Sequence, residues 1–157
     1  MAVRGPFGEL LVAAFPEFRD WTASMIAEEE RFLASLGAAP EEIAAQELSP
    51  YELAFEFTAG VLAPALDGYP DSAPVLRRCA AFMDEVFRRY PDPDDQFHSA
   101  LRITAVERLT EAQRALLRTT APDLPPFRHT PESPAEPYYA DLVGLAEWGA
   151  NQPMDID

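Results

Sequence analysis

The sequence predicts an all-α fold: a single irregular bundle of six to seven helices, followed by a proline-rich C-terminal strap and a short terminal helix. Three observations lead to this prediction. Apolar residues recur at helical spacing along most of the first 120 residues, prolines and capping residues divide the chain into helix-sized segments, and no segment alternates apolar and polar residues as a strand would. With 48% hydrophobic residues among 157, the chain is apolar enough to bury a core despite its charge.

The first helices are marked by their apolar spacing and by the residues that end them. A short apolar segment occupies 7–14, and a longer helix is expected over 17–36 with its apolar side chains in one stripe. Gly37 fits the position just past the end of this helix, and Pro40 fits the first turn of the next, which is expected over 40–48. The predicted stripe consists of Phe18, Trp21, Met25, Ile26, Phe32, Leu33 and Leu36.

A third start signal lies in the middle of the chain. Ser49 can cap a helix, Pro50 suits its first position, and Glu52 completes the pattern of a capping box. We expect this helix to run to about Leu66, with Pro64 kinking or ending it, because proline cannot donate a helical hydrogen bond.

Three further helices are expected before residue 120. The segment 73–90 has the most regular amphipathic pattern in the chain. Acidic residues then open a fifth helix, expected over 92–109. Thr110 and Gln113 have the spacing of a capping box, which predicts the start of a sixth helix.

The composition changes after residue 120, and this change defines the predicted domain organisation. Residues 1–120 are expected to form the helical domain, and 121–137, with six prolines, an extended strap. A short helix over 138–149 is expected to dock on the domain, because its aromatic side chains are costly to leave in water. Residues 150–157 are expected to fray.

Charge is the most informative feature of the composition. The chain has 27 acidic residues, twelve arginines and no lysine, for a net charge of −15. Residues 1–60 have eleven acids and three arginines, whereas 61–120 have nine acids and eight arginines. An acidic protein repels phosphate backbones, so direct nucleic-acid binding is not expected, and a basic protein partner is favoured.

The sequence contains few residues that carry chemistry. It has one cysteine, two histidines and none of the usual phosphate-binding, nucleophilic or metal-binding motifs, so we predict no catalytic residue, no metal and no cofactor. Asp94 and Asp95 precede His98 at helical spacing, but acids at a helix start are ordinary capping residues. An unpaired Cys79, no signal-peptide pattern and no long apolar run favour a cytoplasmic protein without a membrane span.

The predicted partner-binding residues are acids of the two helices expected over 17–36 and 40–48. Within the run 28–30, Glu29 falls inside the apolar stripe, where it would be either a buried acid, part of a binding groove, or a gap in the core that reaches solvent. The full predicted set is Glu17, Asp20, Glu28, Glu29, Glu30, Glu41 and Glu42.

Three short motifs carry a family resemblance: Phe-Pro-Glu-Phe at 15–18, Phe-Met-Asp-Glu-Val-Phe at 82–87 and Val-Glu-Arg-Leu at 106–109. In this arrangement the chain resembles small all-α bacterial proteins grouped with the immunity proteins of polymorphic toxin systems. The resemblance implies a cytoplasmic protein that binds and neutralises a toxin domain, and it implies no catalytic residues. It also implies that Glu107 is a characteristic acid, although Glu107 has an equally good structural role in pairing with arginines of a neighbouring helix.

Two other functions stay open at this point. One is a small helical enzyme or ligand-binding protein that uses an internal cavity near Glu29, Tyr51, Phe55 and Phe57. The other is a structural or regulatory subunit that forms homo-oligomers through an aromatic face. The favoured function is an acidic protein-binding module that inhibits a basic toxin domain.

Overall fold

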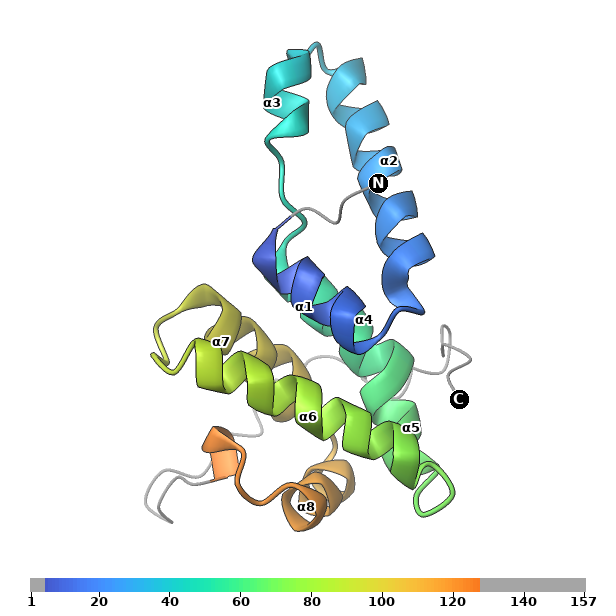
Figure 1. Ribbon diagram of the computed structural model, residues 1–157, viewed down its shortest axis with the longest axis vertical. Helices are drawn as coiled ribbons and strands as arrows, with labels where there is room; N and C mark the ends of the chain where they lie inside the picture. Colours follow the sequence, from blue (N-terminus) through green and yellow to red (C-terminus); the bar gives the residue numbers. More distant parts are fainter. Residues whose placement is uncertain (1–4, 128–157) are drawn as a thin grey trace. The chain divides into compact units, whose positions relative to one another are not determined.

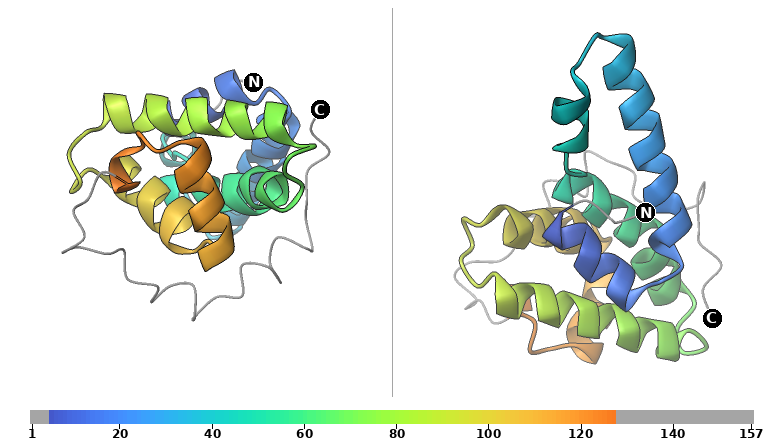
Figure 2. Two further views of the ribbon diagram at one scale, coloured as in Figure 1. Left: turned by 90° about the horizontal axis from the view of Figure 1, so that it is seen from below. Right: turned by 45° about the horizontal axis from the view of Figure 1, so that its top comes forward.

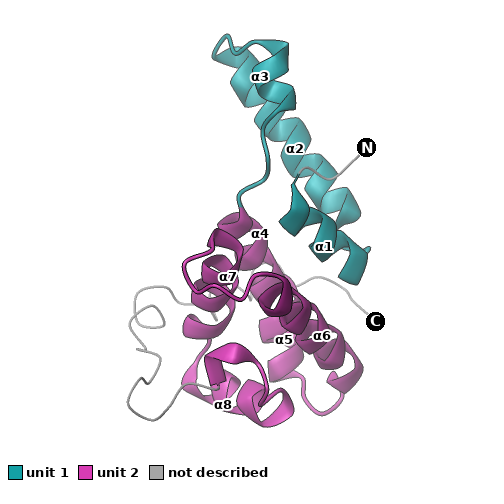
Figure 3. Cartoon of the chain, turned by 60° about the vertical axis from the view of Figure 1, so that its left-hand side comes forward, with its two compact units in different colours: residues 1–49 teal, residues 50–157 magenta. Residues whose placement is uncertain are grey.

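The computed structural model describes residues 5–127, and every regular element in them is helical, so the predicted all-α class is confirmed (Figure 1). The chain divides into two compact units, residues 1–49 and residues 50–157 (Figure 3). This division into two units was not predicted from the sequence. None of the helices in the described residues is long and apolar enough to cross a membrane.

Unit 1 is built on one long helix. Helix α2 (Phe18–Ser35) packs against α1 (Pro6–Ala14) and against the short α3 (Pro40–Ala44). In Figure 3, α1 lies beside the first half of α2 and α3 beside its last turns. Phe15 and Phe18 meet edge to face, with ring centroids 6.4 Å apart, at the turn between α1 and α2. Both rings are fully buried, so this turn is a centre of packing in unit 1.

The end of α2 has the geometry that glycine permits. Gly37 has a φ of +83°, which side chains other than glycine rarely adopt. The amide of Gly37 donates to the carbonyl of Ala34, and the amide of Ala38 donates to that of Leu33, both at 3.1 Å. These two bonds form a Schellman motif, so the predicted helix end at Gly37 is confirmed.

Helix α3 begins at Pro40 as predicted but is shorter than expected. The sequence predicted a helix over 40–48, whereas α3 ends at Ala44. The residues at 45–47 offer no large apolar side chain, and a short helix gains stability mainly from an apolar face. The next large apolar residue, Leu48, is buried with 6% of its surface exposed, but it lies in the loop that follows α3.

Unit 2 begins with a continuous helical segment that contains a wider turn. Helix α4 (Pro50–Phe57) passes through the π-helical η1 (Thr58–Leu62) into α5 (Ala63–Asp67). The Thr58 hydroxyl donates to the carbonyl of Ala54 at 2.8 Å, and the amide of Ala63 reaches back five residues to the Thr58 carbonyl. Pro64 lies in the first turn of α5, directly after this wider turn, and the helical segment continues past it to Asp67. The expectation that Pro64 ends the helix is therefore wrong.

The remaining helices of unit 2 surround a well-filled core. Helix α6 (Ala73–Arg89) contacts α5, η1 and α7 (Gln96–Leu101), and its length is plain in both views of Figure 2. The buried stripe of α6 contains most of the residues that its amphipathic pattern predicts: Leu76, Cys79, Phe82, Met83, Val86 and Phe87. The side chain of Asp95 caps α7, accepting from the amide of Phe97 at 2.8 Å.

The last described helices follow α7 directly. The π-helical η2 (Arg102–Glu107) leads to α8 (Glu111–Thr120). Thr110 and Gln113 form the predicted capping box, each side chain accepting from the other residue's amide, at 3.1 and 2.9 Å. A 3-10 turn, η3 (Pro125–Phe127), ends the described chain.

Most of the predicted C-terminal organisation lies outside the described residues. Of the strap predicted over 121–137, the structure describes 121–127, where Leu124 is buried. The helix expected over 138–149 and the tail over 150–157 lie beyond the described part of the chain.

Candidate functional site

All seven predicted partner-binding acids lie in unit 1, on or directly before helices α2 and α3. Glu17 and Asp20 are at the start of α2, and Glu28, Glu29 and Glu30 lie in its C-terminal half. At a rise of about 1.5 Å per residue, these two groups are roughly 15 Å apart along the helix, so they are not one cluster. Glu41 and Glu42 occupy the first turn of α3.

Most of these acids face solvent. The side chains of Glu17, Asp20, Glu28, Glu41 and Glu42 are exposed, whereas those of Glu29 and Glu30 are half-buried. Glu29 therefore does not become the fully buried acid that one of its three alternatives describes.

Charge pairing distinguishes three of these acids from two acids of unit 2. Among the described residues, Glu28, Glu41 and Glu42 have no ion-pair partner. In unit 2, by contrast, Glu85 pairs with two arginines of α6, and Glu107 pairs with Arg102 at 2.6 Å.

The helix dipole explains only some of the acids on unit 1. Acids in the first turn of a helix are stabilised by the positive end of the dipole, which accounts for Glu41 and Glu42 in α3. Glu28 has no such stabilisation, because it lies in the C-terminal half of α2, whose last turn contains no basic residue. The charge of Glu28 is therefore uncompensated by either a cation or its own helix end.

The apolar stripe of α2 is buried for only part of its length. Phe18 and Ile26 have 0% and 2% of their surface exposed, but Phe32 and Leu36 have 61% and 67% exposed. The predicted stripe is therefore packed near the start of the helix and open to solvent at its far end. Glu28, Phe32 and Leu36 follow one another at four-residue spacing, so they share one side of α2. We call these three residues the open face of α2.

Two of the three aromatic residues named for the alternative site pack on neighbouring side chains of unit 2. Phe57 is fully buried and its ring lies 4.9 Å from that of Phe82, while Phe55 lies beneath the guanidinium of Arg108, 4.9 Å from its carbon. Both rings are in contact with neighbouring side chains. Tyr51, the third aromatic residue of this hypothesis, is 42% exposed.

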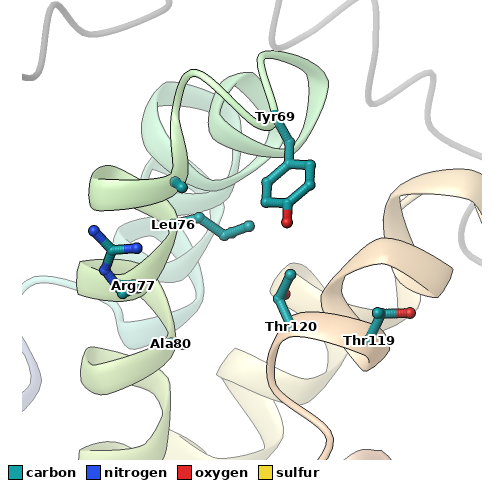
Figure 4. A pocket seen from close by; sticks show the side chains of 7 residues that line it. Tyr69, Leu76, Arg77, Ala80, Thr119 and Thr120 are labelled. Atoms are coloured by element: carbon teal, nitrogen blue, oxygen red, sulfur yellow. The ribbon is translucent and has the colours of Figure 1, made fainter.

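Unit 2 contains a hollow of about 320 Å³ between α6 and the end of α8, at other residues. In Figure 4, Leu76 and Tyr69 point toward each other above Thr120, and the guanidinium of Arg77 is turned away from Tyr69. The hydroxyls of the two threonines in its wall already donate to carbonyls of α8. The lining residues include no histidine, carboxylate or cysteine, so no base lies next to these hydroxyls, as acyl-transfer chemistry would require. The lining residues are Tyr69, Ala73, Leu76, Arg77, Ala80, Thr119 and Thr120.

The titratable residues singled out in the sequence have structural surroundings. His98 is buried, its Nδ1 lies 2.8 Å from the carbonyl oxygen of Tyr90, and its ring packs against Phe87. Cys79 is fully buried among apolar side chains, and burial raises the pKa of its thiol. No group of three or more potential metal ligands comes together within residues 5–127.

Arg114 is a buried charged residue that was not predicted from the sequence. Its guanidinium donates to three carbonyl oxygens at the end of η2, those of Val106, Glu107 and Leu109, at 2.8 to 3.2 Å. Burial, reinforced by the charge of Arg118, lowers the pKa of Arg114. Glu107 thus has a structural role, since its carboxylate binds Arg102 and its carbonyl accepts from Arg114.

Comparisons of the chain with known protein families, with curated proteins and with solved structures found no match. The fold and the surface therefore define the protein only as an all-α protein with an acidic helical hairpin, α2–α3.

Proposed function

We propose that unit 1 is a protein-binding module whose α2–α3 hairpin recognises a basic protein surface. The observation that carries the proposal is the uncompensated charge of this unit. Residues 5–49 contain nine acids and only two arginines. Glu28, Glu41 and Glu42 are exposed and have no ion-pair partner within the described residues.

A surface of this kind suits association with a cation-rich partner. Clustered charge of one sign attracts the opposite charge over several ångströms and raises association rates by about 10- to 1,000-fold. Charges that are already paired within one protein contribute much less, because their fields cancel. Unit 2 is partly of this second kind, because Arg88, Arg89 and Arg102 are bound to acids and Arg114 is bound to carbonyls.

Within this class, the proposed role is an immunity-type inhibitor that neutralises a basic toxin domain in the cytoplasm of a bacterium. The support for this narrower role is the sequence resemblance to immunity proteins together with the acidic hairpin. Toxin domains that act on nucleic acids need basic surfaces, so an acidic inhibitor can both accelerate association and cover the path of the substrate.

The test uses the C-terminal domain of a secreted protein encoded beside this gene, immobilised for surface plasmon resonance. We expect association that slows steeply between 0.05 and about 0.5 M salt, because the Debye length falls from roughly 14 to 4 Å. We also expect the double variant Glu28→Arg, Glu42→Arg to lower the association rate about tenfold or more.

A matched control separates local from global charge. The double variant Asp71→Arg, Asp123→Arg changes the net charge by the same amount on exposed residues of unit 2. It should leave the association rate within about twofold, because those residues lie outside the hairpin. Association that is independent of salt, or equal losses in the two double variants, contradicts the proposal.

A further inference from the structure

We infer that the open face of α2 inserts Phe32 and Leu36 into an apolar recess that is rimmed by basic residues on the partner. This inference rests on the proposed function and adds the chemistry of the partner. It assigns two tasks to neighbouring residues: the acids attract the partner, and the two apolar side chains hold it.

Both apolar side chains of the open face are exposed to solvent. Phe32 and Leu36 are each more than half exposed although they continue the stripe that buries Phe18 and Ile26. They are two of the four large hydrophobic residues that are exposed within the described chain. An apolar stripe that continues beyond its own packing partners is typical of a surface that another molecule covers.

The geometry of the hairpin holds these residues in place. The Schellman motif at Gly37 fixes the end of α2 one residue after Leu36, through the bonds of Gly37 and Ala38 to the last turn. Leu33, on the adjacent row, is half-buried. The apolar side chains therefore stand on a stabilised helix end, so little backbone conformational entropy is lost when a partner covers them.

Charge complementarity identifies the occupant. Glu28 lies one turn before Phe32 on the same side of α2, and Glu41 and Glu42 follow on α3, after the turn at Gly37. A second copy of this chain would bring like charges together at this face, which costs binding energy. A partner that covers the two apolar residues and also satisfies the acids must be apolar at its centre and basic at its rim.

The experiment uses two synthetic helical peptides of equal charge, one of lysine and leucine and one of lysine and glutamine. We measure their binding to the full chain by fluorescence anisotropy at 0.15 M salt. The wild-type chain should bind the lysine–leucine peptide at least about tenfold more tightly, because only this peptide can cover the two apolar side chains. The double variant Phe32→Ser, Leu36→Ser should lose this preference and keep the weaker, charge-driven binding of both peptides.

A matched variant and a folding check keep the result specific. Tyr51→Ser with Tyr69→Ser removes the two large exposed hydrophobics of unit 2 and should retain the preference. Circular dichroism checks each variant, and the single variant Leu36→Ser, which should show a reduced preference, replaces the double variant if that one does not fold.

The outcomes distinguish this inference from the proposed function. Equal, salt-sensitive binding of both peptides overturns the inference and leaves the acidic binding function standing. Binding of neither peptide contradicts both. Sedimentation of the wild-type chain as a dimer that Phe32→Ser dissociates also overturns the inference, because a second copy then covers the open face.

Discussion

The two units of this protein differ in how completely some of their charged and large apolar side chains are satisfied internally. In unit 2, Glu85 and Glu107 are bound to arginines, and the large rings of Phe57 and Phe87 are buried. In unit 1, by contrast, the acids of the α2–α3 hairpin outnumber the cations and Phe32 is open to solvent. A protein stabilises its own fold by satisfying such groups internally, so the unit that leaves them unsatisfied is the better candidate for binding.

The largest expected effect comes from matched phenylalanine truncations in the two units. Phe57→Ala should lower the free energy of unfolding by about 3–5 kcal/mol, because it leaves a cavity beside Phe82. Phe32→Ala should change it by less than about 0.5–1 kcal/mol, because most of that ring is already in water. Urea unfolding followed by circular dichroism measures both.

Similar losses in the free energy of unfolding for the two truncations would contradict this contrast between the units. A large loss in Phe32→Ala would mean that this residue supports the fold of unit 1. The open face would then be part of the core, and its assignment to binding would be wrong.

An intermediate effect is expected at the end of α2, where unit 1 depends on a single glycine. A Cβ added to Gly37 meets no atom within 4 Å, so the cost of Gly37→Ala is almost purely that of the left-handed backbone conformation. We expect a loss of about 1–2 kcal/mol in the free energy of unfolding.

Gly37→Asn is the matched control for this substitution. Asparagine adopts the left-handed conformation more readily than alanine, so it should restore part of the lost stability. Equal losses in the two variants would show that the added side chain acts through something other than backbone conformation.

The sequence predicted the features that depend on neighbours within a few residues. The helix end at Gly37, the start of α3 at Pro40, and the capping box of Thr110 with Gln113 are all present. Each depends on hydrogen bonds or steric limits between residues that are close along the chain, so a local pattern is sufficient to specify it.

The features that depend on packing between separate elements could not be predicted. The periodicity of α2 shows which residues share a side, but burial requires another element to cover them, and nothing within the described residues covers Phe32 and Leu36 as fully as Phe18. Arg114 was missed for the same reason, since its partners are carbonyls at the end of η2, and a helical pattern does not show which carbonyls are left free.

The smallest effect is expected at Glu56, an acid of unit 2 that is not compensated. Burial, reinforced by the charge of Glu52, raises the pKa of Glu56 in the folded protein. The ionised carboxylate therefore disfavours folding at neutral pH, and this cost disappears as the pH falls through the raised pKa and the folded state takes up a proton.

Glu56→Gln should raise the melting temperature at pH 7 and have little effect near pH 4. Glu52→Gln, which removes only the neighbouring charge, should raise it less. If Glu56→Gln lowers the melting temperature at pH 7, the ionised carboxylate stabilises unit 2, and the contrast in charge compensation between the units is sharper than the structure indicates.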